Sequence, residues 1–316
     1  MSNSRKRTEE IMSHSKQPIV VFGATGQQGG SVATALIKAD WPVIALVRDP
    51  GSARADALLQ AGVELVQGSY ADTHAIRTAM RDAYGVFSVQ QSSPSGELTD
   101  DEEVRVGISV ADLAVEAGVA HLVYSSGAAV SDTPTGMGHF DSKMRIEQHI
   151  RTLPMRSTII RPVAFIDMLV MPGFGLDTGQ FNFFMHPDQS IQLLAVEDIG
   201  KFVEPIFADP RRFGDQTFEI ASDTVTGKEL EVLFSEAAGR PISYARFTEE
   251  VLEGSPFLAG LTALLDAGRL AGTADLDALR AVNPAMQSVR EWLAGAGRAP
   301  FQSALGASGS WDYNRG

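Results

Sequence analysis

The 316-residue chain contains no cysteine, which excludes disulfide bonds, thiolate catalysis and cysteine zinc sites. Its six histidines are scattered and form neither an H-x-x-x-H nor an H-E-x-x-H pattern, so we expect no metal site. The chain also lacks any run of about 18 apolar residues, the length that a membrane-spanning helix needs. Residues 1–17 are polar and lack the apolar stretch of a signal peptide. We therefore expect a disordered leader over 1–17, no membrane association and a cytoplasmic protein.

Basic residues are in deficit. The sequence has 26 Lys and Arg against 39 Asp and Glu, a net charge of −13. Such a surface repels nucleic acid unless a local basic patch overrides it, and the nearest basic cluster, Arg5-Lys6-Arg7, lies in the expected leader. A direct DNA-binding role is therefore disfavoured. Hydrophobic residues make up 44% of the chain, which is ordinary for a globular protein with a sizeable core.

The strongest motif is a glycine-rich turn, Gly23-Ala24-Thr25-Gly26-Gln27-Gln28-Gly29. It follows the apolar run 18–22 and precedes the amphipathic run 31–38, so the order is strand, tight turn and helix. Glycines at such a turn let the backbone approach a phosphate, and the helix N-terminus offers free N–H groups and a positive dipole end. A glycine triplet alone is a weak signal, but this context predicts a dinucleotide-binding site.

Strand and helix patterns alternate through the first half of the chain. The expected helices are 53–61, 73–81, 101–117 and 140–151, and the expected strands after the first are 43–47, 63–66, 85–89, 120–124 and 157–160. This alternation predicts an α/β fold of the Rossmann type, with a doubly wound parallel sheet. Ligands of such sheets bind beyond the carboxyl ends of the strands, so the residues that follow each strand are the candidates for a site.

The second half is less regular. We expect a helix over 196–208, a strand over 217–220, a helix that begins at Thr226 with Glu229 in a capping box, a strand over 242–246, and helices over 249–265, 276–281 and 284–294. The prediction is a Rossmann domain over 18–165 that segments after residue 190 complete. A smaller C-terminal α/β lobe, mostly 166–294, closes over the cofactor and forms the substrate cleft. The tail 295–316, rich in Gly, Ser and Ala, should be loosely held.

Several segments together carry a family resemblance: 21–32 around the glycine turn, Ala45 to Pro50, His139 to Lys143, Ile159 to Pro162 with Phe165, and Val196 to Gly200. They resemble the NmrA-like proteins, an atypical branch of the short-chain dehydrogenase/reductase superfamily, over about 18–247. Within that family the pattern is similar to the HSCARG-like proteins, which sense NADPH. The resemblance implies a Rossmann fold and NADP(H) binding.

Arg48 follows the second strand, nineteen residues after Gly29, at the place where NAD sites usually carry an acid for the ribose 2′-OH. A guanidinium there can pair with the 2′-phosphate of NADP(H) and stack on adenine. The alternative is a surface arginine paired with Asp49, and Asp49 also keeps NAD(H) open as a cofactor. We favour NADP(H).

Loops after the third and fourth strands supply further candidates. Tyr70 or Asp72 would touch the adenine, as the resemblance implies, although Asp72 serves equally well as the N-cap of the next helix. Gln90, Gln91 and Ser92 can supply amides and a hydroxyl near the nicotinamide ribose, or simply fill a loop. The full set of expected cofactor contacts is Gly23, Thr25, Gly26, Gln27, Gln28, Gly29, Arg48, Asp72, Gln90, Gln91, Ser125, Lys143, Pro162 and Phe165.

Ser125 and Ser126 follow the fifth strand, where dehydrogenases of the superfamily keep a serine that binds the reacting carbonyl. Those enzymes then use Tyr-x-x-x-Lys, whereas this chain has His139 and Lys143. Four residues apart on a helix, the two side chains share one face. Lys143 can bind the nicotinamide ribose or stabilise an anion. His139, with an ordinary pKa near 6.5, can donate a proton or can be a buried histidine without a catalytic role. The candidate catalytic residues are Lys143, His139 and Ser126.

Phenylalanines gather after the sixth strand, at positions 165, 174, 181, 183 and 184. They form either an apolar substrate pocket or the core of the lobe. Two functions remain open. One is an NADP(H)-binding redox sensor that signals through a protein partner, with a homodimer among the expected assemblies. The other is an NADPH-dependent reductase of a small apolar carbonyl, quinone or enone that uses Lys143 and His139.

Overall fold

The central sheet is parallel throughout. The computed structural model describes residues 16–91 and 98–306. Val20 pairs in parallel with Ile44 on one side and with Val86 on the other, so the first strand lies at the centre. The order β10-β6-β5-β4-β1-β2-β3 reverses direction at β1, which confirms the doubly wound Rossmann-type fold. These strands are β1 (Ile19–Val21), β2 (Val43–Val47), β3 (Glu64–Gln67), β4 (Gly85–Ser88), β5 (His121–Ser125), β6 (Arg156–Pro162) and β10 (Thr217–Ile220).

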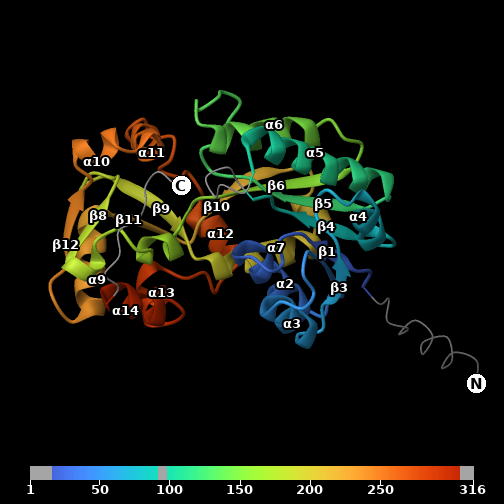
Figure 1. Ribbon diagram of the computed structural model, residues 1–316, viewed down its shortest axis with the longest axis horizontal. Coiled ribbons are helices and arrows are strands. Elements are labelled where there is room, and N and C mark those ends of the chain that lie inside the picture. The colour runs from blue at the N-terminus through green and yellow to red at the C-terminus, as the bar shows by residue number, and fades with distance from the viewer. Residues whose placement is uncertain (1–15, 92–97, 307–316) are drawn as a thin grey trace, which may run out of the picture.

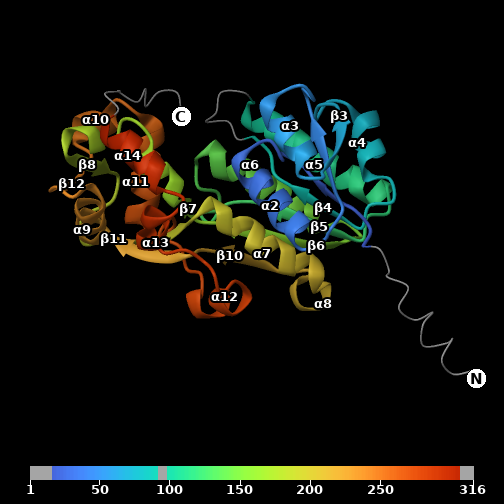
Figure 2. The same ribbon diagram turned by 90° about the horizontal axis from the view of Figure 1, so that it is seen from below.

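Helices cover both faces of this sheet (Figures 1 and 2). On one face lie α2 (Gln27–Lys38), α3 (Ala53–Gln60) and α7 (Val196–Ala208), which α8 (Pro210–Phe213) follows. On the other lie α4 (Thr73–Met80), α5 (Asp100–Glu116) and α6 (Gly138–Ile150). Two apolar clusters fill the space between the helices and the sheet, one on each face. The central strands β1, β2 and β4 are buried on both sides, which is why they are nearly continuous apolar runs.

The C-terminal lobe lies beside this domain (Figure 1). It contains a sheet of β11 (Asp223–Thr226), β9 (Ser190–Leu194) and β7 (Ala164–Phe165), and the pair β12 (Ser243–Arg246) and β8 (Gln180–Phe183). Two short 3-10 helices, η2 (Ile166–Val170) and η3 (Leu176–Thr178), precede β8. The α-helices are α9 (Gly227–Ala238), α10 (Glu249–Glu253), α11 (Pro256–Asp266), α12 (Leu276–Val282), α13 (Val289–Ala294) and α14 (Arg298–Gly306). Between these segments the chain returns to the first domain through α7 and β10.

Three expectations for the second half differ from the structure. The helix expected over 249–265 is two helices, because Ser255 caps a new helix whose first residue is Pro256. The helix expected over 284–294 begins only at Val289, after the cap Ser288. Strands β7, β8, β9 and β11 have no counterpart in the sequence reading, since short strands of a mixed lobe carry little periodicity.

The chain after Gly295 also differs from the expected loose tail. Residues 298–306 form α14, and Phe301 is 1% exposed against Phe234, with ring centroids 5.4 Å apart. Phe301 and Ala304 both belong to the core of the lobe, so burial of apolar surface holds this helix in place. Most of the expected leader, 1–15, and the end of the chain, 307–316, lie outside the described residues. In the described part of the chain, no helix combines the length and the apolar character needed to span a bilayer.

Candidate functional site: a dinucleotide cavity

The glycine turn has the geometry that its sequence predicts. Gly23 adopts φ +66°, in the left-handed region, and its carbonyl accepts a hydrogen bond from the Gly26 N–H at 2.8 Å. A Cβ on Gly29 would lie 2.3 Å from the Gly23 oxygen, so only glycine lets α2 begin so close to the turn. The N-cap of α2 is Gly26, which has no side chain to accept hydrogen bonds, and the first turn has no acid. The helix therefore presents its first N–H groups and its positive dipole end to a ligand.

A cavity of about 850 Å³ opens over this turn. It extends across the carboxyl ends of β1, β2, β3 and β4 and reaches one face of α5. Its volume and its position at the point where the strand order reverses suit a dinucleotide. Among the expected cofactor contacts, the residues in its wall are Gly23, Thr25, Gly26, Gln27, Gln28, Gly29, Arg48, Gln90, Gln91 and Phe165.

Two arginines stand in the wall of the cavity beyond the end of β2. Arg48 follows β2, and Arg54, in the first turn of α3, donates to the Thr25 carbonyl at 3.3 Å. Asp49 is not in the wall, because its carboxylate accepts from the Gly51 N–H at 2.9 Å within its own turn. The place of the usual ribose acid is therefore cationic, which suits a 2′-phosphate. Sequence reasoning missed Arg54, although its position six residues after Arg48, at a helix start, was a usable signal.

In the loop after β3, one of the two residues expected at the adenine lies in the cavity wall and the other does not. Asp72 lies outside the wall and accepts from the Ala75 N–H at 2.9 Å, which is the N-cap alternative. Tyr70 is in the wall, stacks on Phe22 at 5.6 Å between centroids, and donates its hydroxyl to the Val89 carbonyl at 2.7 Å. Burial raises the pKa of Tyr70, so the phenol stays protonated.

Gln90 offers an unused acceptor in the wall. It is 9% exposed, and its Nε2 donates to the Ser88 hydroxyl at 2.8 Å, while its Oε1 is buried without a partner. A buried carbonyl oxygen left without a donor costs free energy that a bound ligand can recover. Ser92 lies outside the described residues.

Helix α5 supplies a wall that the sequence did not suggest. Four of its residues line the cavity at the spacing of one helix face: Glu102, Arg105, Val106 and Ser109. Leu98 lies in the same wall, just before the helix. The 102–109 spacing was visible in the sequence, but it says which residues share a face, not what that face meets.

Ser125 and Ser126 point to different partners. The Ser125 hydroxyl donates to Gln28 Oε1 at 2.7 Å, beside the cavity. The Ser126 hydroxyl donates to Glu147 Oε1 at 2.6 Å, away from the wall. Glu147 is fully buried and also accepts from both Arg161 and Arg151. Ser126 is thus part of a buried charged cluster. Pro162, the other expected contact on this side, is buried in β6 and is not in the wall.

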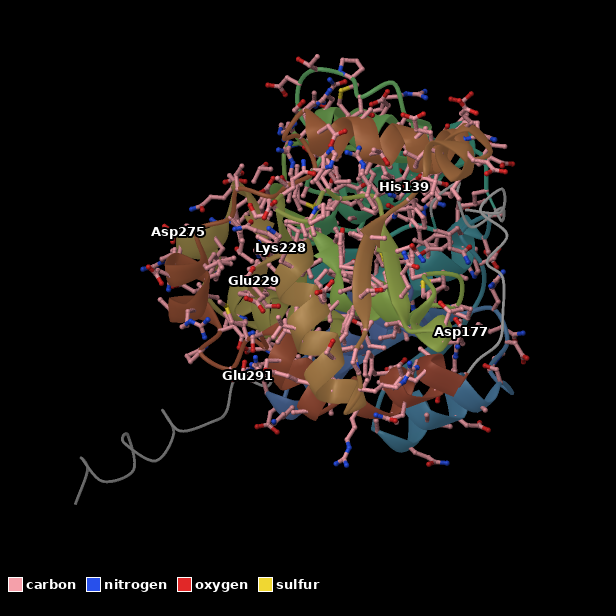
Figure 3. The ribbon with its side chains drawn as sticks, turned by 90° about the vertical axis from the view of Figure 1, so that its left-hand side faces the viewer. His139, Asp177, Lys228, Glu229, Asp275 and Glu291 are labelled. Atoms are coloured by element: carbon pink, nitrogen blue, oxygen red, sulfur yellow. The ribbon has the colours of Figure 1, made fainter. Side chains whose placement is uncertain are left out.

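Lys143 and His139 also lie outside the cavity wall. Lys143 Nζ donates to Glu103 Oε1 at 2.8 Å and to the His139 carbonyl at 3.0 Å. The His139 ring packs edge-on against Phe140 and Phe257, with centroids 4.6 and 6.0 Å away. It lies close to the helices at the top of the C-terminal lobe (Figure 3).

Burial lowers the pKa of His139 to about 3, with the charge of Lys143 as the second cause. The imidazole is therefore neutral at pH 7, as the sequence reading expected from the neighbouring lysine. Its Nδ1 is buried without a partner. Phe174, Phe181 and Phe183 are buried together in the core of the lobe, as is Phe184. The core alternative therefore holds for these four rings, and Phe165 is the ring that reaches the cavity.

Among the described residues, no group of three or more His, Asp and Glu side chains could hold a metal ion. Fold and site together define a dinucleotide-binding protein of the Rossmann type. The family model for the NmrA-like family matches residues 15–288. The chain belongs to that family.

The relatives of the chain include enzymes and regulators. It is 30% identical over 262 residues to the NmrA-like family domain-containing oxidoreductase malD of Malbranchea aurantiaca, covering 74% of this chain and 77% of malD. Its fold is similar to that of NmrA, a negative transcriptional regulator solved in complex with NAD (TM-score 0.77, 20% identity, 92% and 98% of the two chains). It is also similar to the triphenylmethane reductase of Citrobacter sp. complexed with NADP(H) (TM-score 0.73, 20% identity, 91% and 100%).

Proposed function

We propose that this protein binds NADP(H) and acts in the cytoplasm as a redox sensor or regulator, not as a Tyr-x-x-x-Lys dehydrogenase. The glycine turn and the N-terminus of α2 would hold the pyrophosphate, Arg48 and Arg54 the 2′-phosphate, and Gln90 a donor group of the ligand. Solved NmrA structures contain NAD in one case and NADP in another, so both nucleotides suit this fold. When bound, the nicotinamide supplies a ring that is cationic if oxidised and neutral if reduced.

The observation that carries the proposal is a contrast within the site. The wall of the cavity holds an acceptor without a partner and two arginines, whereas Ser126, Lys143 and the His139 ring lie outside it. Ser126 and Lys143 are each bound to a buried carboxylate. This contrast favours cofactor binding without proton transfer to a substrate. A sensor needs only the first, together with a partner protein or a second copy that responds to the bound form.

Calorimetric titration with NADPH, NADP⁺ and NADH tests the first half of this proposal. We expect NADPH and NADP⁺ to bind more tightly than NADH. The second half is tested by mixing NADPH with a panel of quinones, enones and aldehydes, and following absorbance at the reduced cofactor's band. Turnover that His139→Phe or Lys143→Ala abolishes would contradict a sensor-only role.

The second candidate is an NADPH-dependent reductase of a small apolar carbonyl, quinone or enone. It is favoured by relatives such as malD, which are named oxidoreductases. In that role Lys143 would have to leave Glu103 to reach the cofactor or a developing anion, and His139 would have to give up a proton. The position of Lys143 therefore separates the two candidates.

A further inference from the structure

Two faces of helix α5 make different contacts. One face, with Glu102, Arg105 and Val106, lines the dinucleotide cavity. The next carries Glu103 and Gly107 against α6, and a Cβ on Gly107 would lie 2.6 Å from Ile146 Cδ1. This tight approach leaves no slack between the two helices. A ligand that seats against α5 therefore acts on a helix that is packed directly on α6.

Glu103 binds α6 through both of its carboxylate oxygens. Oε1 accepts from Lys143 Nζ at 2.8 Å, and Oε2 accepts from the Ser142 hydroxyl at 2.9 Å. The side chain of Glu103 is 1% exposed and that of Lys143 is 11% exposed. Both charges are thus desolvated, and each satisfies the other. We call this pair the Glu103–Lys143 lock.

A buried ion pair of this kind is weak evidence for stability, because apolar residues of similar volume often serve as well or better. We therefore look for a role of Glu103 that depends on where it holds the Lys143 ammonium. Lys143 is outside the cavity wall, and its stem packs beside the loop that follows β5: a Cβ on Gly127 would be 3.7 Å from Lys143 Cδ. Gly127 follows two residues after Ser125, which is hydrogen-bonded to Gln28 in the cavity wall.

We propose that Glu103 is a positioning residue that holds the Lys143 ammonium clear of the nicotinamide end of the cavity. The inference rests on the proposed NADP(H) binding. With the lock closed, the nicotinamide ring meets no nearby cation, and NADP⁺ and NADPH are accepted alike at this end. With the lock open, the ammonium reaches the ring, repels the cationic oxidised form and tolerates the neutral reduced form. Glu103 thereby sets the redox selectivity of the site.

Lysine footprinting tests the closed lock without any nucleotide. The full chain is treated with limiting acetic anhydride, and modification is read by mass spectrometry. We expect Lys143 to react at least about tenfold more slowly than the exposed Lys38, because its amine is buried in an ion pair. In Glu103→Gln the rate at Lys143 should rise towards that of Lys38, and in the milder Ser142→Ala it should rise by about threefold. Equal rates at Lys143 and Lys38 in the unmodified protein would overturn the proposal.

Nucleotide selectivity tests what the lock does. The ratio of the Kd for NADP⁺ to the Kd for NADPH should rise by about tenfold in Glu103→Gln, because the released ammonium repels the oxidised ring. Glu103→Gln combined with Lys143→Met should return the ratio to its original value, which a purely structural role of Glu103 would not do. Glu116→Gln, on the exposed end of the same helix, is the matched control and should leave the ratio unchanged.

An unchanged ratio in folded Glu103→Gln overturns the proposal even if both nucleotides bind. If the unmodified protein binds neither nucleotide, the proposed function fails, and so does the selectivity that rests on it. The footprint then reports only whether the ion pair is closed. If Glu103→Gln does not fold, Ser142→Ala carries both measurements, with a smaller rise expected in each. No change in either measurement for folded Ser142→Ala would count against the lock.

Discussion

The two halves of the site treat their polar groups in opposite ways. Around the glycine turn, helix N–H groups, the Gln90 oxygen and two arginines face a cavity. At the β5–α6 junction, the Ser126 hydroxyl is hydrogen-bonded to Glu147 and the Lys143 ammonium is paired with Glu103. The His139 ring is packed between two phenylalanines. Polar groups of the first half face the cavity, whereas the hydroxyl and the ammonium of the second half have partners within the protein. The difference teaches that one Rossmann domain can leave polar groups open around its glycine turn while it pairs those after its fifth strand with buried carboxylates.

The largest expected effect comes from the first half. Gly29→Ala should reduce NADPH affinity by more than about 100-fold, because its Cβ would lie 2.3 Å from the Gly23 oxygen and force the turn apart. Isothermal titration calorimetry measures the loss. Gly306→Ala, where a Cβ would meet nothing within 4 Å, is the control and should bind normally. Tight binding by Gly29→Ala would mean that the cavity does not depend on this turn.

In the second half, burial of His139 should make the stability of the protein depend on pH. The pKa of His139 is lowered from 6.5 to about 3 in the folded protein, so below pH 6.5 the unfolded chain takes up a proton that the folded chain refuses. This contribution to stability is complete above pH 6.5 and declines as the pH falls towards 3. Between pH 7.5 and pH 4.5, the free energy of unfolding of the unmodified protein should fall by about 3 kcal/mol more than that of His139→Phe.

Urea unfolding of both proteins at the two pH values provides the comparison. His121 contributes in the same direction, because burial lowers its pKa from 6.5 to about 4, but it is present in both proteins and cancels. Identical pH dependence in His139→Phe would show that His139 is not held neutral.

A smaller effect should separate the two cofactors. Arg54→Ala, like Arg48→Ala, should weaken NADPH binding by about 10- to 100-fold, since each would remove one of the charge-assisted hydrogen bonds that we propose for the 2′-phosphate. NADH binding should change by less than about threefold. Arg77→Ala, whose guanidinium pairs with the exposed Glu116, is the matched control. Equal losses for NADPH and NADH would contradict the assignment of the phosphate site.

The smallest expected effect concerns His139 and tests directly whether the two halves of the site are separate. His139→Phe should leave NADPH affinity within about twofold of the original, because the ring lies outside the cavity wall and is replaced by one of similar shape. The same titration measures it. A large loss of NADPH affinity in His139→Phe would show that the His139 ring contributes to nucleotide binding.

Much of the first domain could be predicted because its elements are long and strongly patterned. Strand 43–47, helix 196–208 and strand 217–220 were predicted with the bounds that the structure has. The Thr226 capping box was predicted too, because its partner is three residues away. The lobe was harder, since β7 has two residues and β8 has four, and their pairing partners are distant in sequence.

The candidate site divides along the same line. Local sequence determined the glycine turn, since the φ of Gly23 and the crowding at Gly29 depend on neighbours within a few residues. It also placed Arg48 after β2. Only the tertiary structure decided that α5 forms part of the cavity wall, that Glu103 binds Lys143 and that Glu147 binds Ser126. Those contacts join residues 21 to 40 positions apart, and spacing along a chain does not say which buried charges will meet.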